Sequence, residues 1–286
     1  MTAALSALVE RYTGRRVAAS RPMSGGCVGQ VLLLTLADHK GQMGGQVVAK
    51  LGPGLEPEGW MLRYLASHSR LPVPTLVHAD DDLLLMEYVD SGGVLTASSQ
   101  AHAADLLAHL HGVTWHDFGL ERDTVIGALP QPNPPTPRWL DFYRDHRLLH
   151  MAGEALKAGR LPAATMVRIE TLAARLGRWL EEPAQPSLLH GDAWTGNILV
   201  RGDRVGAFID PALYYGHPEI ELAFGTMFGT FGDPFFRRYE EMRPLAPGFW
   251  EARRDLYLLY PLLVHVRLFG GSYLGGVETT LDRFVG

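Results

Sequence analysis

Two aspartates and an asparagine in the second half of the chain have types and a spacing suited to chemistry on a hydroxyl group. Asp192 is followed by Asn197 five residues later and by Asp210 thirteen residues after that. A carboxylate can accept the proton of an attacking hydroxyl, and carboxylate and amide oxygens are ligands that Mg²⁺ prefers. We therefore predict that Asp192 is a catalytic base and that Asn197 and Asp210 bind Mg²⁺. The alternative is a β-hairpin in which these residues only cap turns.

His190 extends the pattern to the spacing H-x-D-x-x-x-x-N followed by D. This is the spacing of the catalytic loop and the metal-binding aspartate of kinases. A histidine at this position is usually structural, so we expect His190 to hold the loop by hydrogen bonds. The kinase interpretation requires further parts earlier in the chain, namely groups that contact phosphate, an acid that positions a lysine, and a strand that binds adenine.

A glycine-rich segment at residues 23–30 is the candidate phosphate loop, and it runs into the apolar, strand-like residues 31–34. Gly25, Gly26 and Cys27 lie at its centre, where glycines let backbone N–H groups approach a phosphate closely. The segment lacks the G-K-[ST] ending of a P-loop, which disfavours a P-loop NTPase. An ordinary hairpin turn at the two glycines is the alternative.

Lys50 closes the short strand-like run at residues 47–50, as does the lysine that contacts the α- and β-phosphates in kinases. Alternatively, it ends a strand at the surface. Pro57 is suited to the start of a helix, and Glu58 in the first turn of that helix could pair with Lys50. Glu56 is the competing acid, since a negative charge near a helix N-terminus is favourable without any pairing.

Residues 83–88 form an apolar run that predicts a buried strand and leads into Asp90-Ser91-Gly92-Gly93. This is the layout of the hinge strand between the two lobes of a kinase. Met86, Glu87 and Tyr88 are therefore the candidates whose backbone groups bind the adenine of ATP. All these signals occur in the order that a kinase requires, and together they predict an ATP-dependent phosphotransferase.

The sequence resembles the fructosamine kinase (ketosamine-3-kinase) family, a relative of the aminoglycoside phosphotransferases. The resemblance covers nearly the whole chain and is carried by residues 126–133, Trp139, Phe142, Arg147, Leu148, 190–197, 209–219, 221–223, 256–260, His265 and 268–273. The strings D-P-A-x-Y-Y-G-H-x-E and L-F-G-x-x-Y are much more specific to the family than the catalytic loop. Departures are mild: Ala193 and Thr195 stand where Leu and Ser or Gly are usual, and Glu221 stands where Asp is usual.

The resemblance implies an α+β, two-lobed protein-kinase-like fold, with a β-rich N-lobe at residues 1–88, a hinge at 89–92 and a mainly helical C-lobe at 93–286. It implies that ATP and Mg²⁺ serve to phosphorylate the 3-hydroxyl of a ketosamine, which is a deglycation activity. The ketosamine would be a fructosamine or a ribulosamine, either free or on a glycated protein lysine. An aminoglycoside or amino-alcohol phosphotransferase and a non-catalytic, nucleotide-binding pseudokinase are the alternatives.

The same resemblance suggests residues that contact the substrate. Trp194 either packs in the core or offers a flat surface to the sugar or the amine. His217 and Glu219 either help to bind a cationic amine or belong to a helix N-terminus. Cys27, the only cysteine, is either a small loop residue or a redox-sensitive position that bridges two chains, although a reducing cytosol disfavours a stable disulfide. We expect a monomer or a weak dimer, which Cys27 could link when oxidised.

Composition agrees with a globular protein large enough for two lobes. The 286 residues are 47% hydrophobic and 20% charged, and the net charge of −5 offers no basic surface to nucleic acid or to an anionic membrane. Residues 1–10 do not resemble a signal peptide, and the apolar segment 256–269 is too short to span a membrane. A single cysteine excludes an internal disulfide, and we expect a cytoplasmic protein.

Three further segments of the helical part can be assigned from their patterns. Leu106, Leu107 and Leu110 have helical spacing within residues 100–112, which end at a glycine as helices often do. Residues 129–137 contain five prolines and predict a loop. Residues 139–182 predict helices.

Overall fold

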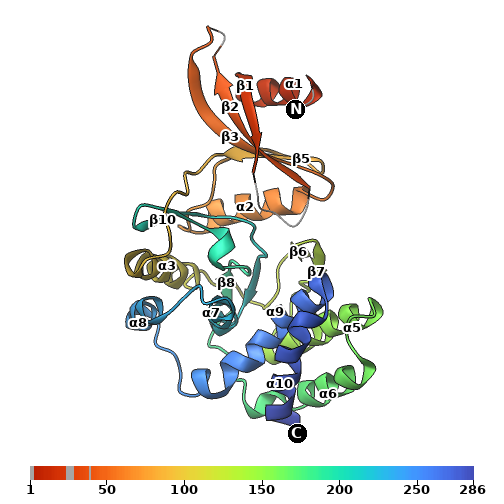
Figure 1. Cartoon of the computed structure of the whole chain (residues 1–286). Helices are drawn as coiled ribbons and strands as arrows, with labels where there is room; N and C mark the ends of the chain where they lie inside the picture. The colour runs from red at the N-terminus through yellow and green to blue at the C-terminus, as the bar shows by residue number, and fades with distance from the viewer. Residues whose placement is uncertain (1–2, 24–28, 39) are drawn as a thin grey trace.

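The computed structural model describes residues 3–23, 29–38 and 40–286, and Figure 1 shows a sheet at one end of the protein and a helical part at the other. The sheet has five antiparallel strands in the order β1-β2-β3-β5-β4. The elements of this part are α1 (Ala3–Thr13), β1 (Arg16–Pro22), β2 (Gln30–Ala37), β3 (Met43–Leu51), α2 (Glu56–His68), β4 (Leu76–Ala79) and β5 (Leu83–Glu87).

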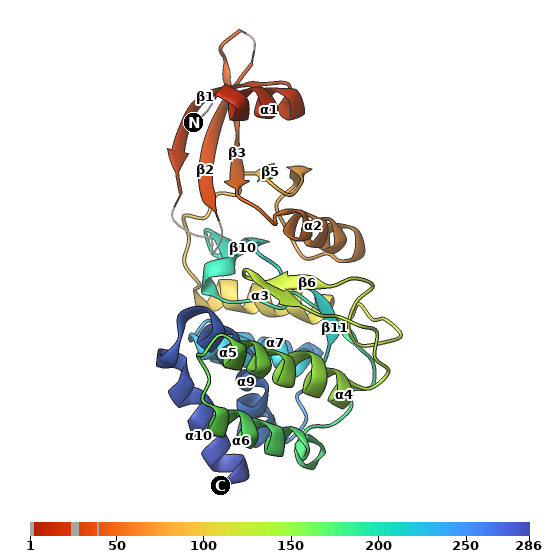
Figure 2. The same ribbon diagram turned by 90° about the vertical axis from the view of Figure 1, so that its right-hand side faces the viewer.

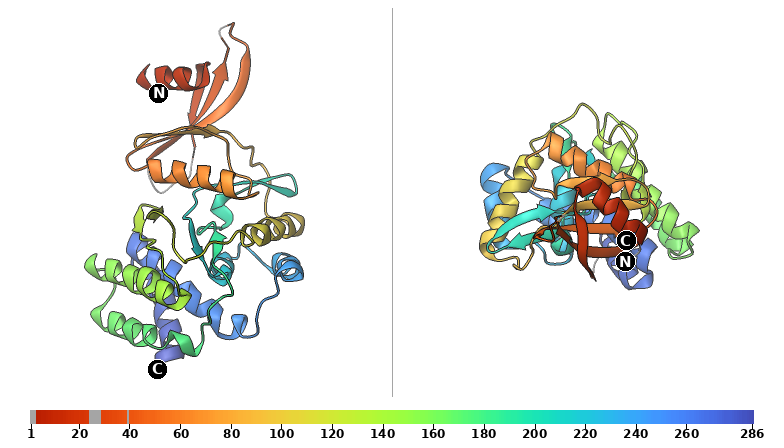
Figure 3. Two further views of the ribbon diagram at one scale, coloured as in Figure 1. Left: turned by 180° about the vertical axis from the view of Figure 1, so that it is seen from behind. Right: turned by 90° about the horizontal axis from the view of Figure 1, so that it is seen from above.

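Both faces of this sheet are covered, which explains why its central strands are continuous apolar runs. Successive side chains of a strand point to opposite faces. Leu34 of β2 packs with Val9 of α1 on one face, and Leu33 packs with Leu62 of α2 on the other. Figure 3 shows from behind that α2 lies between the sheet and the helical part, where it can connect the two.

The helical part is built around one large apolar core. Its helices are α3 (Ala97–Leu110), α4 (Trp139–Tyr143), α5 (His150–Lys157), α6 (Ala163–Ala173), α7 (Pro218–Met227), α8 (Asp233–Met242), α9 (Arg254–Phe269) and α10 (Leu274–Val285). Its short strands are β6 (Thr124–Ile126), β7 (Leu129–Gln131), β8 (Ser187–Leu189), β9 (Ile198–Arg201), β10 (Arg204–Phe208) and β11 (Tyr214–Gly216). Trp139, Tyr143 and Tyr257 are fully buried at the centre of the core. Among the described residues, no helix is both long and apolar enough to cross a membrane.

The prediction of a loop over residues 129–137 is wrong at its start, because Leu129–Gln131 form β7 and pair with β6. Pro130 lies opposite Val125, next to the pair Ile126–Leu129 that flanks the two-residue turn. Hydrogen-bonded and non-hydrogen-bonded pairs alternate in an antiparallel ladder, so the missing N–H of Pro130 falls at a non-bonded position. Figure 2 shows this hairpin directly beneath α2.

Helix α3 starts three residues earlier and ends two residues earlier than the leucine spacing predicts. Thr96 Oγ1 accepts the N–H of Ser99, and Ser99 Oγ accepts the N–H of Thr96, which is a capping box with serine as its second member. The cap thus satisfies backbone groups at the start of the helix. At the other end, His111 follows the last helical residue and is fully buried.

Candidate active site

The segment that carries Asp192 is a tight turn between β8 and β9, and its backbone is held from below by α7. Gly191 has a φ of +84°, and a Cβ atom there would overlap the carbonyl oxygen of Ala212, so only glycine fits. Glu221 in α7 accepts the N–H of Gly191 at 2.6 Å and the N–H of His190 at 3.2 Å. A buried acid therefore fixes the position of the turn.

Glu221 is itself held by His111, whose Nε2 lies 2.9 Å from its Oε2. Burial raises the pKa of Glu221, but the hydrogen bonds and charge of His111 and the backbone donors outweigh burial and hold that pKa below its usual value. The carboxylate therefore remains an acceptor for the turn. His190 also has a structural contact, since its Nδ1 accepts the N–H of Asp192 at 3.3 Å.

Asn197 lies at the other end of the turn and is bonded to Asp192. Its Nδ2 donates to Asp192 Oδ2 at 2.8 Å and to the Asp192 carbonyl at 2.9 Å. Burial raises the pKa of Asp192 to about 7, because the donor on Asn197 only partly offsets burial, while the charges of Asp210 and Glu221 raise it further. A carboxyl group with this pKa can exchange a proton near neutral pH.

Asp210 is brought to the same place by the β9–β10 hairpin. It follows β10, and the N–H of the preceding Ile209 donates to the Asn197 carbonyl at 3.0 Å. Asp210 has a φ of +52°, a left-handed conformation that aspartate tolerates better than most residues. Its carboxylate accepts a hydrogen bond from Lys50, which makes it the connection between the turn and the sheet.

Lys50 reaches this point from β3, and its ammonium group also donates to Glu58 Oε1 at 2.8 Å. Its side chain is only 8% exposed. Burial alone lowers the pKa of Lys50, but the two carboxylates outweigh burial and raise the pKa above its usual value, so the lysine carries a charge. Glu56 does not compete for it, because Glu56 pairs with Arg122 at 2.9 Å.

These five residues, Lys50, Glu58, Asp192, Asn197 and Asp210, line one cavity of about 500 Å³ between the sheet and the helical part. Apolar side chains also line the cavity, among them those of Met23, Val31, Val48, Met86 and Leu199. A cavity lined by both apolar and charged side chains suits a nucleotide, because the faces of its base are apolar and its phosphates are charged.

The hinge strand lines the same cavity with Met86, Glu87 and Tyr88. The N–H of Glu87 donates to the Thr75 carbonyl at 2.8 Å, and the N–H of Tyr88 donates to the Gln46 carbonyl at 3.1 Å. Both donors are thus used within the sheet. Val89 also lines the cavity; it is the first residue of the predicted hinge at 89–92, although it was not named among the residues that bind the nucleotide.

A divalent cation would find two hard oxygen ligands here. The Nδ2 of Asn197 is turned toward Asp192, which leaves its amide oxygen for a cation, and Asp210 supplies a carboxylate. Within the described ranges, no cluster of three or more His, Cys, Asp or Glu side chains could hold a metal ion. The donor set fits Mg²⁺, which commonly takes one or two protein ligands and completes its shell with phosphate oxygens and water.

His217 and Glu219 are not brought into this cavity. Glu219 forms a buried ion pair with Arg253, in which Nε and Nη2 each donate to a carboxylate oxygen at 2.7 Å. His217 caps α7 by accepting the N–H of Glu219 at 3.1 Å. Burial and the neighbouring Arg253 lower the pKa of His217 to about 3, so it is neutral. The geometry therefore favours the structural alternative for both residues.

The remaining predicted residues divide into two groups. Trp194 is partly buried and lines the cavity beside Asp192. Gly25, Gly26 and Cys27 lie outside the described residues.

The sequence did not predict a site role for Gly127, at the tip of the β6–β7 hairpin, which also lines the cavity. The signal was present, because a glycine in a two-residue link between apolar pairs favours a tight hairpin.

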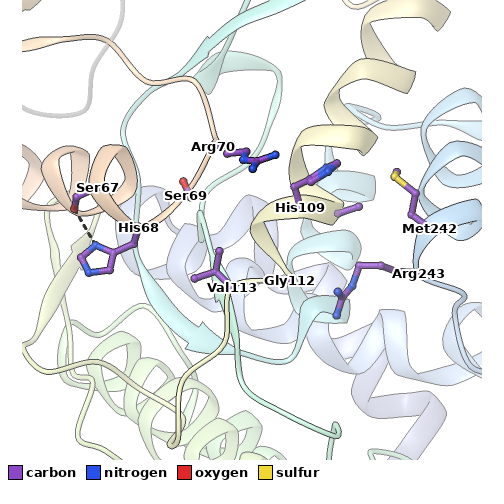
Figure 4. Close-up of a pocket in the computed structure, with 10 residues that line it drawn as sticks. Ser67, His68, Ser69, Arg70, His109, Gly112, Val113, Met242 and Arg243 are labelled. Atoms are coloured by element: carbon purple, nitrogen blue, oxygen red, sulfur yellow. Dashed lines mark hydrogen bonds between the residues drawn. The ribbon is translucent and has the colours of Figure 1, made fainter.

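Two other cavities contain none of the residues that line this one. The first, of about 600 Å³, lies among the C-terminal ends of α2, α3 and α8, where Arg70, His109 and Arg243 are among its basic lining residues (Figure 4). The second, of about 670 Å³, adjoins it and is lined by His217 and Glu219. The first has no carboxylate among its lining residues. In the second, Glu219 is paired with Arg253 and Glu182 accepts the N–H groups of Trp139 and Leu140, so the site is assigned to the cavity between the sheet and the helical part.

Aminoglycoside phosphotransferases have the same fold. APH(4)-Ia, in a complex with ADP and hygromycin B, superposes with a TM-score of 0.67 at 15% identity over all of both chains. This likeness shows the fold alone, which is α+β, two-lobed and protein-kinase-like.

Closer relatives are found by sequence. The probable ketoamine kinase slr1563 of Synechocystis is 33% identical over 290 residues, or 96% of this chain and 94% of the relative. The chloroplastic protein-ribulosamine 3-kinase of Arabidopsis thaliana is 33% identical over 282 residues, which are 92% of this chain and 81% of the relative. A crystal structure from Thermobifida fusca, assigned as a fructosamine-3-kinase, has a TM-score of 0.85 at 33% identity and covers 99% and 98% of the two chains. The family model for fructosamine kinase matches residues 1–286, and the chain therefore belongs to the fructosamine kinase family.

Proposed function

We propose that this protein transfers the γ-phosphoryl group of ATP to the 3-hydroxyl group of a ketosamine. Membership of the fructosamine kinase family and the ketoamine and ribulosamine kinases among its relatives support the substrate class. The observation that carries the proposal is one cavity in which the Lys50–Glu58–Asp210 ion pairs face the bonded pair Asp192–Asn197. That arrangement supplies the phosphate-binding lysine, two candidate metal ligands and a base, which are central parts of a phosphoryl-transfer site.

Lys50 contacts the α- and β-phosphates in this proposal, and Glu58 holds the lysine in place. Asn197 and Asp210 hold Mg²⁺, which when bound neutralises charge on the phosphates. In the free protein, Lys50 already neutralises Asp210, so the nucleotide enters a site whose charges are arranged in advance. Such preorganisation is the main contribution a protein makes to this reaction.

Asp192 accepts the proton of the acceptor hydroxyl. Its pKa of about 7 makes the carboxylate a stronger base than an ordinary aspartate, yet it remains largely ionised slightly above neutral pH. The bond from Asn197 fixes the orientation of the carboxylate and leaves Oδ1 for the substrate. Positioning of the hydroxyl in line with the γ-phosphorus contributes the rest.

Backbone groups of the hinge bind adenine. Met86 pairs with Val48 of β3, and the N–H of Tyr88 donates to the Gln46 carbonyl of the same strand. Because alternate residues of a strand bond to the same neighbour, the N–H and C=O groups of Glu87 face away from β3. The Glu87 carbonyl and the Val89 N–H are the groups we assign to adenine. Tyr88 then contributes its side chain rather than its N–H.

The product explains the biological effect. Loss of a proton from C1 of a ketosamine 3-phosphate gives an enaminol, which expels the phosphate from C3. Hydrolysis of the remaining imine then frees the amine, so phosphorylation starts deglycation. The sugar part of a fructosamine is one carbon longer than that of a ribulosamine. We propose that the site accepts both.

We also propose that residues 1–88 form the N-lobe, 89–92 the hinge and 93–286 the C-lobe. The sheet with α1 and α2 before the hinge and the helices after it support this division.

Since the reaction consumes ATP, the protein belongs in a compartment that supplies it, and we propose the cytoplasm. The chain is proposed to act as a monomer or weak dimer, in which Cys27 could link two chains on oxidation.

ATP consumption against a panel of synthetic ketosamines and aminoglycosides tests the substrate class. We expect Mg²⁺-dependent turnover with ketosamines at a kcat/KM above that of every aminoglycoside. Faster phosphorylation of an aminoglycoside would contradict the proposal and favour the antibiotic-kinase alternative. The absence of turnover with both classes would favour a pseudokinase.

A further inference from the structure

The backbone that follows Asp210 is held by side chains from a distant part of the chain. We call residues 210–213 the metal segment. The carbonyl oxygen of Ala212 accepts a hydrogen bond from Gln131 Nε2 at 3.0 Å, and the carbonyl oxygen of Leu213 accepts one from Thr124 Oγ1 at 3.1 Å. The two donors lie opposite each other in the β6–β7 hairpin. The hairpin therefore contacts the chain two and three residues after the proposed metal ligand.

The two donors belong to a buried group of four polar side chains, which we call the amide network: Thr124, Gln131, Asn133 and Arg147. Thr124 Oγ1 accepts Gln131 Nε2 at 2.9 Å and Asn133 Nδ2 at 2.8 Å, and Asn133 Oδ1 accepts Arg147 Nη2 at 2.5 Å. No member is more than 3% exposed. Buried polar groups are costly unless they are hydrogen-bonded, and the network bonds them to one another and to the metal segment.

The direction of each hydrogen bond in the network is determined by its two ends. Arg147 can only donate, so Asn133 turns its oxygen toward Arg147 and its Nδ2 toward Thr124. At the other end, the Tyr260 hydroxyl donates to Gln131 Oε1 at 2.7 Å, so Gln131 turns its Nε2 toward Thr124 and the metal segment. The Thr124 oxygen accepts two hydrogen bonds in this way, and its one hydrogen is left for the carbonyl of the metal segment.

Asp210 needs such support because its backbone is strained. Its φ is +52°, although a residue before a proline prefers an extended conformation. Residues in such conformations persist only where the surrounding structure holds them. Before Asp210, the Ile209 N–H donates to the Asn197 carbonyl; after it, the Ala212 N–H donates to the His190 carbonyl at 2.8 Å. The carbonyls on this second side depend on the amide network.

The network has no direct contact with the nucleotide cavity. Its four members all lie in the described part of the chain, and none is among the residues that line the cavity. An effect on catalysis must therefore pass through the metal segment. Mg²⁺ demands nearly ideal octahedral geometry, so a small displacement of a ligand carboxylate weakens binding. Groups that orient a metal ligand from behind commonly change metal affinity or activity by about 10–100-fold.

We propose that the amide network holds Asp210 in the position that Mg²⁺ requires, and that its four members are positioning residues for phosphoryl transfer. This inference rests on the proposed role of Asp210 as a Mg²⁺ ligand. Arg147 acts at the far end by orienting the amide of Asn133, and Thr124 acts at the near end by holding a carbonyl.

Thr124→Val tests the network, and Thr280→Val is the matched control. Valine keeps the shape of threonine and removes the hydroxyl. Thr280 is also buried, and its Oγ1 donates only to the Gly276 carbonyl of its own helix at 3.1 Å. Calorimetry measures the Kd of the ATP analogue AMP-PNP in Mg²⁺ and in EDTA, and the ratio of the two values is the gain in affinity from Mg²⁺. Initial rates with a ketosamine give kcat and KM, and thermal melting shows whether each variant folds.

In Thr124→Val, the gain from Mg²⁺ and kcat should each fall about tenfold, while the Kd in EDTA and the KM for the ketosamine stay within about twofold. Thr124→Ser keeps the hydroxyl and should restore most of both losses. Thr280→Val should change none of these quantities. A loss of packing alone would not act selectively on the gain from Mg²⁺.

Asn133→Asp is a second test, which decides the matter if Thr124→Val does not fold. A carboxylate keeps the contact with Arg147 as an ion pair, but it has no N–H to donate. The Thr124 hydroxyl should then donate to this carboxylate instead of to the metal segment. The gain from Mg²⁺ should fall, although an added negative charge by itself would favour a cation.

A full gain from Mg²⁺ in folded Thr124→Val or in Asn133→Asp, or an equal loss in Thr280→Val, would overturn the inference while the kinase activity stands. A wild-type protein whose affinity for AMP-PNP does not depend on Mg²⁺ would overturn the proposed role of Asp210 as well.

Discussion

Replacement of Asp192 by Asn should abolish most activity and at the same time stabilise the protein at alkaline pH. The substitution keeps the shape of the side chain and an oxygen that can accept the bond from Asn197. It removes the base, so kcat should fall by about 10²–10⁴-fold, the usual value of a positioned acid–base group. Binding of ATP should persist, because the nucleotide contacts are made by other residues.

The stability change follows from the pKa of Asp192. Folding raises this pKa from 3.8 to about 7, so the folded protein binds the proton more tightly than the unfolded chain. The resulting stability is fully present below about pH 4 and is lost as the pH rises through 7. The full difference corresponds to about 4 kcal/mol. Because Asp192 is not fully shielded from solvent, we expect a gain of about 1–2 kcal/mol in Asp192→Asn at pH 8.

Chemical denaturation at pH 5 and at pH 8 measures this change, and initial rates with a ketosamine measure the activity. The variant should be more stable than the wild type at pH 8, by less at pH 5, and nearly inactive at both. Loss of activity with a gain in stability cannot result from unfolding. A variant that keeps most of its activity, or that is less stable at pH 8, would show that Asp192 is not the buried base.

The other predictions concern the cation, the pH profile and the buried ion pair. Asp210→Ala should reduce Mg²⁺-dependent transfer more than Asn197→Ala in rate measurements, since a carboxylate offsets phosphate charge and an amide does not; small, equal effects would argue against this cation site. In the wild type, kcat/KM should fall about tenfold per pH unit below about pH 6.5 as Asp192 is protonated, and a rate that is flat down to pH 5 would contradict its role. Arg253→Met should destabilise the protein by about 3–5 kcal/mol in denaturation experiments, because Glu219 is left buried and unpaired, and a second change, Glu219→Gln, should restore much of the loss.

Much of the site could be predicted because its parts are local in the sequence. Asp192, Asn197 and Asp210 are joined by one turn and one short hairpin, so their spacing nearly determines their geometry. The sequence indicates Glu58 as the partner of Lys50 and leaves Glu56 open as the competing acid, although helical periodicity favours Glu58. Glu58 is three, four and seven residues before Met61, Leu62 and Leu65, which are buried on the face of α2 toward the sheet and the core.

The residues that could not be placed depend on partners far away in the sequence. Glu219 is turned away from the cavity by Arg253, 34 residues later, and no local pattern predicts that pair. The hairpin at β7 was missed for another reason, since a cluster of prolines suggests a loop unless the register shows that Pro130 needs no donor.

Identification of the product tests the central claim most directly. The protein is incubated with ATP, Mg²⁺ and the ribulosamine or fructosamine of lysine, and phosphorus and carbon NMR follow the reaction. We expect a burst of ADP and a phosphate ester at C3, followed by slow release of inorganic phosphate and free lysine, with the ribulosamine at least as reactive as the fructosamine. A stable phosphate ester at any other hydroxyl, or ADP formation that no ketosamine stimulates, would contradict the account.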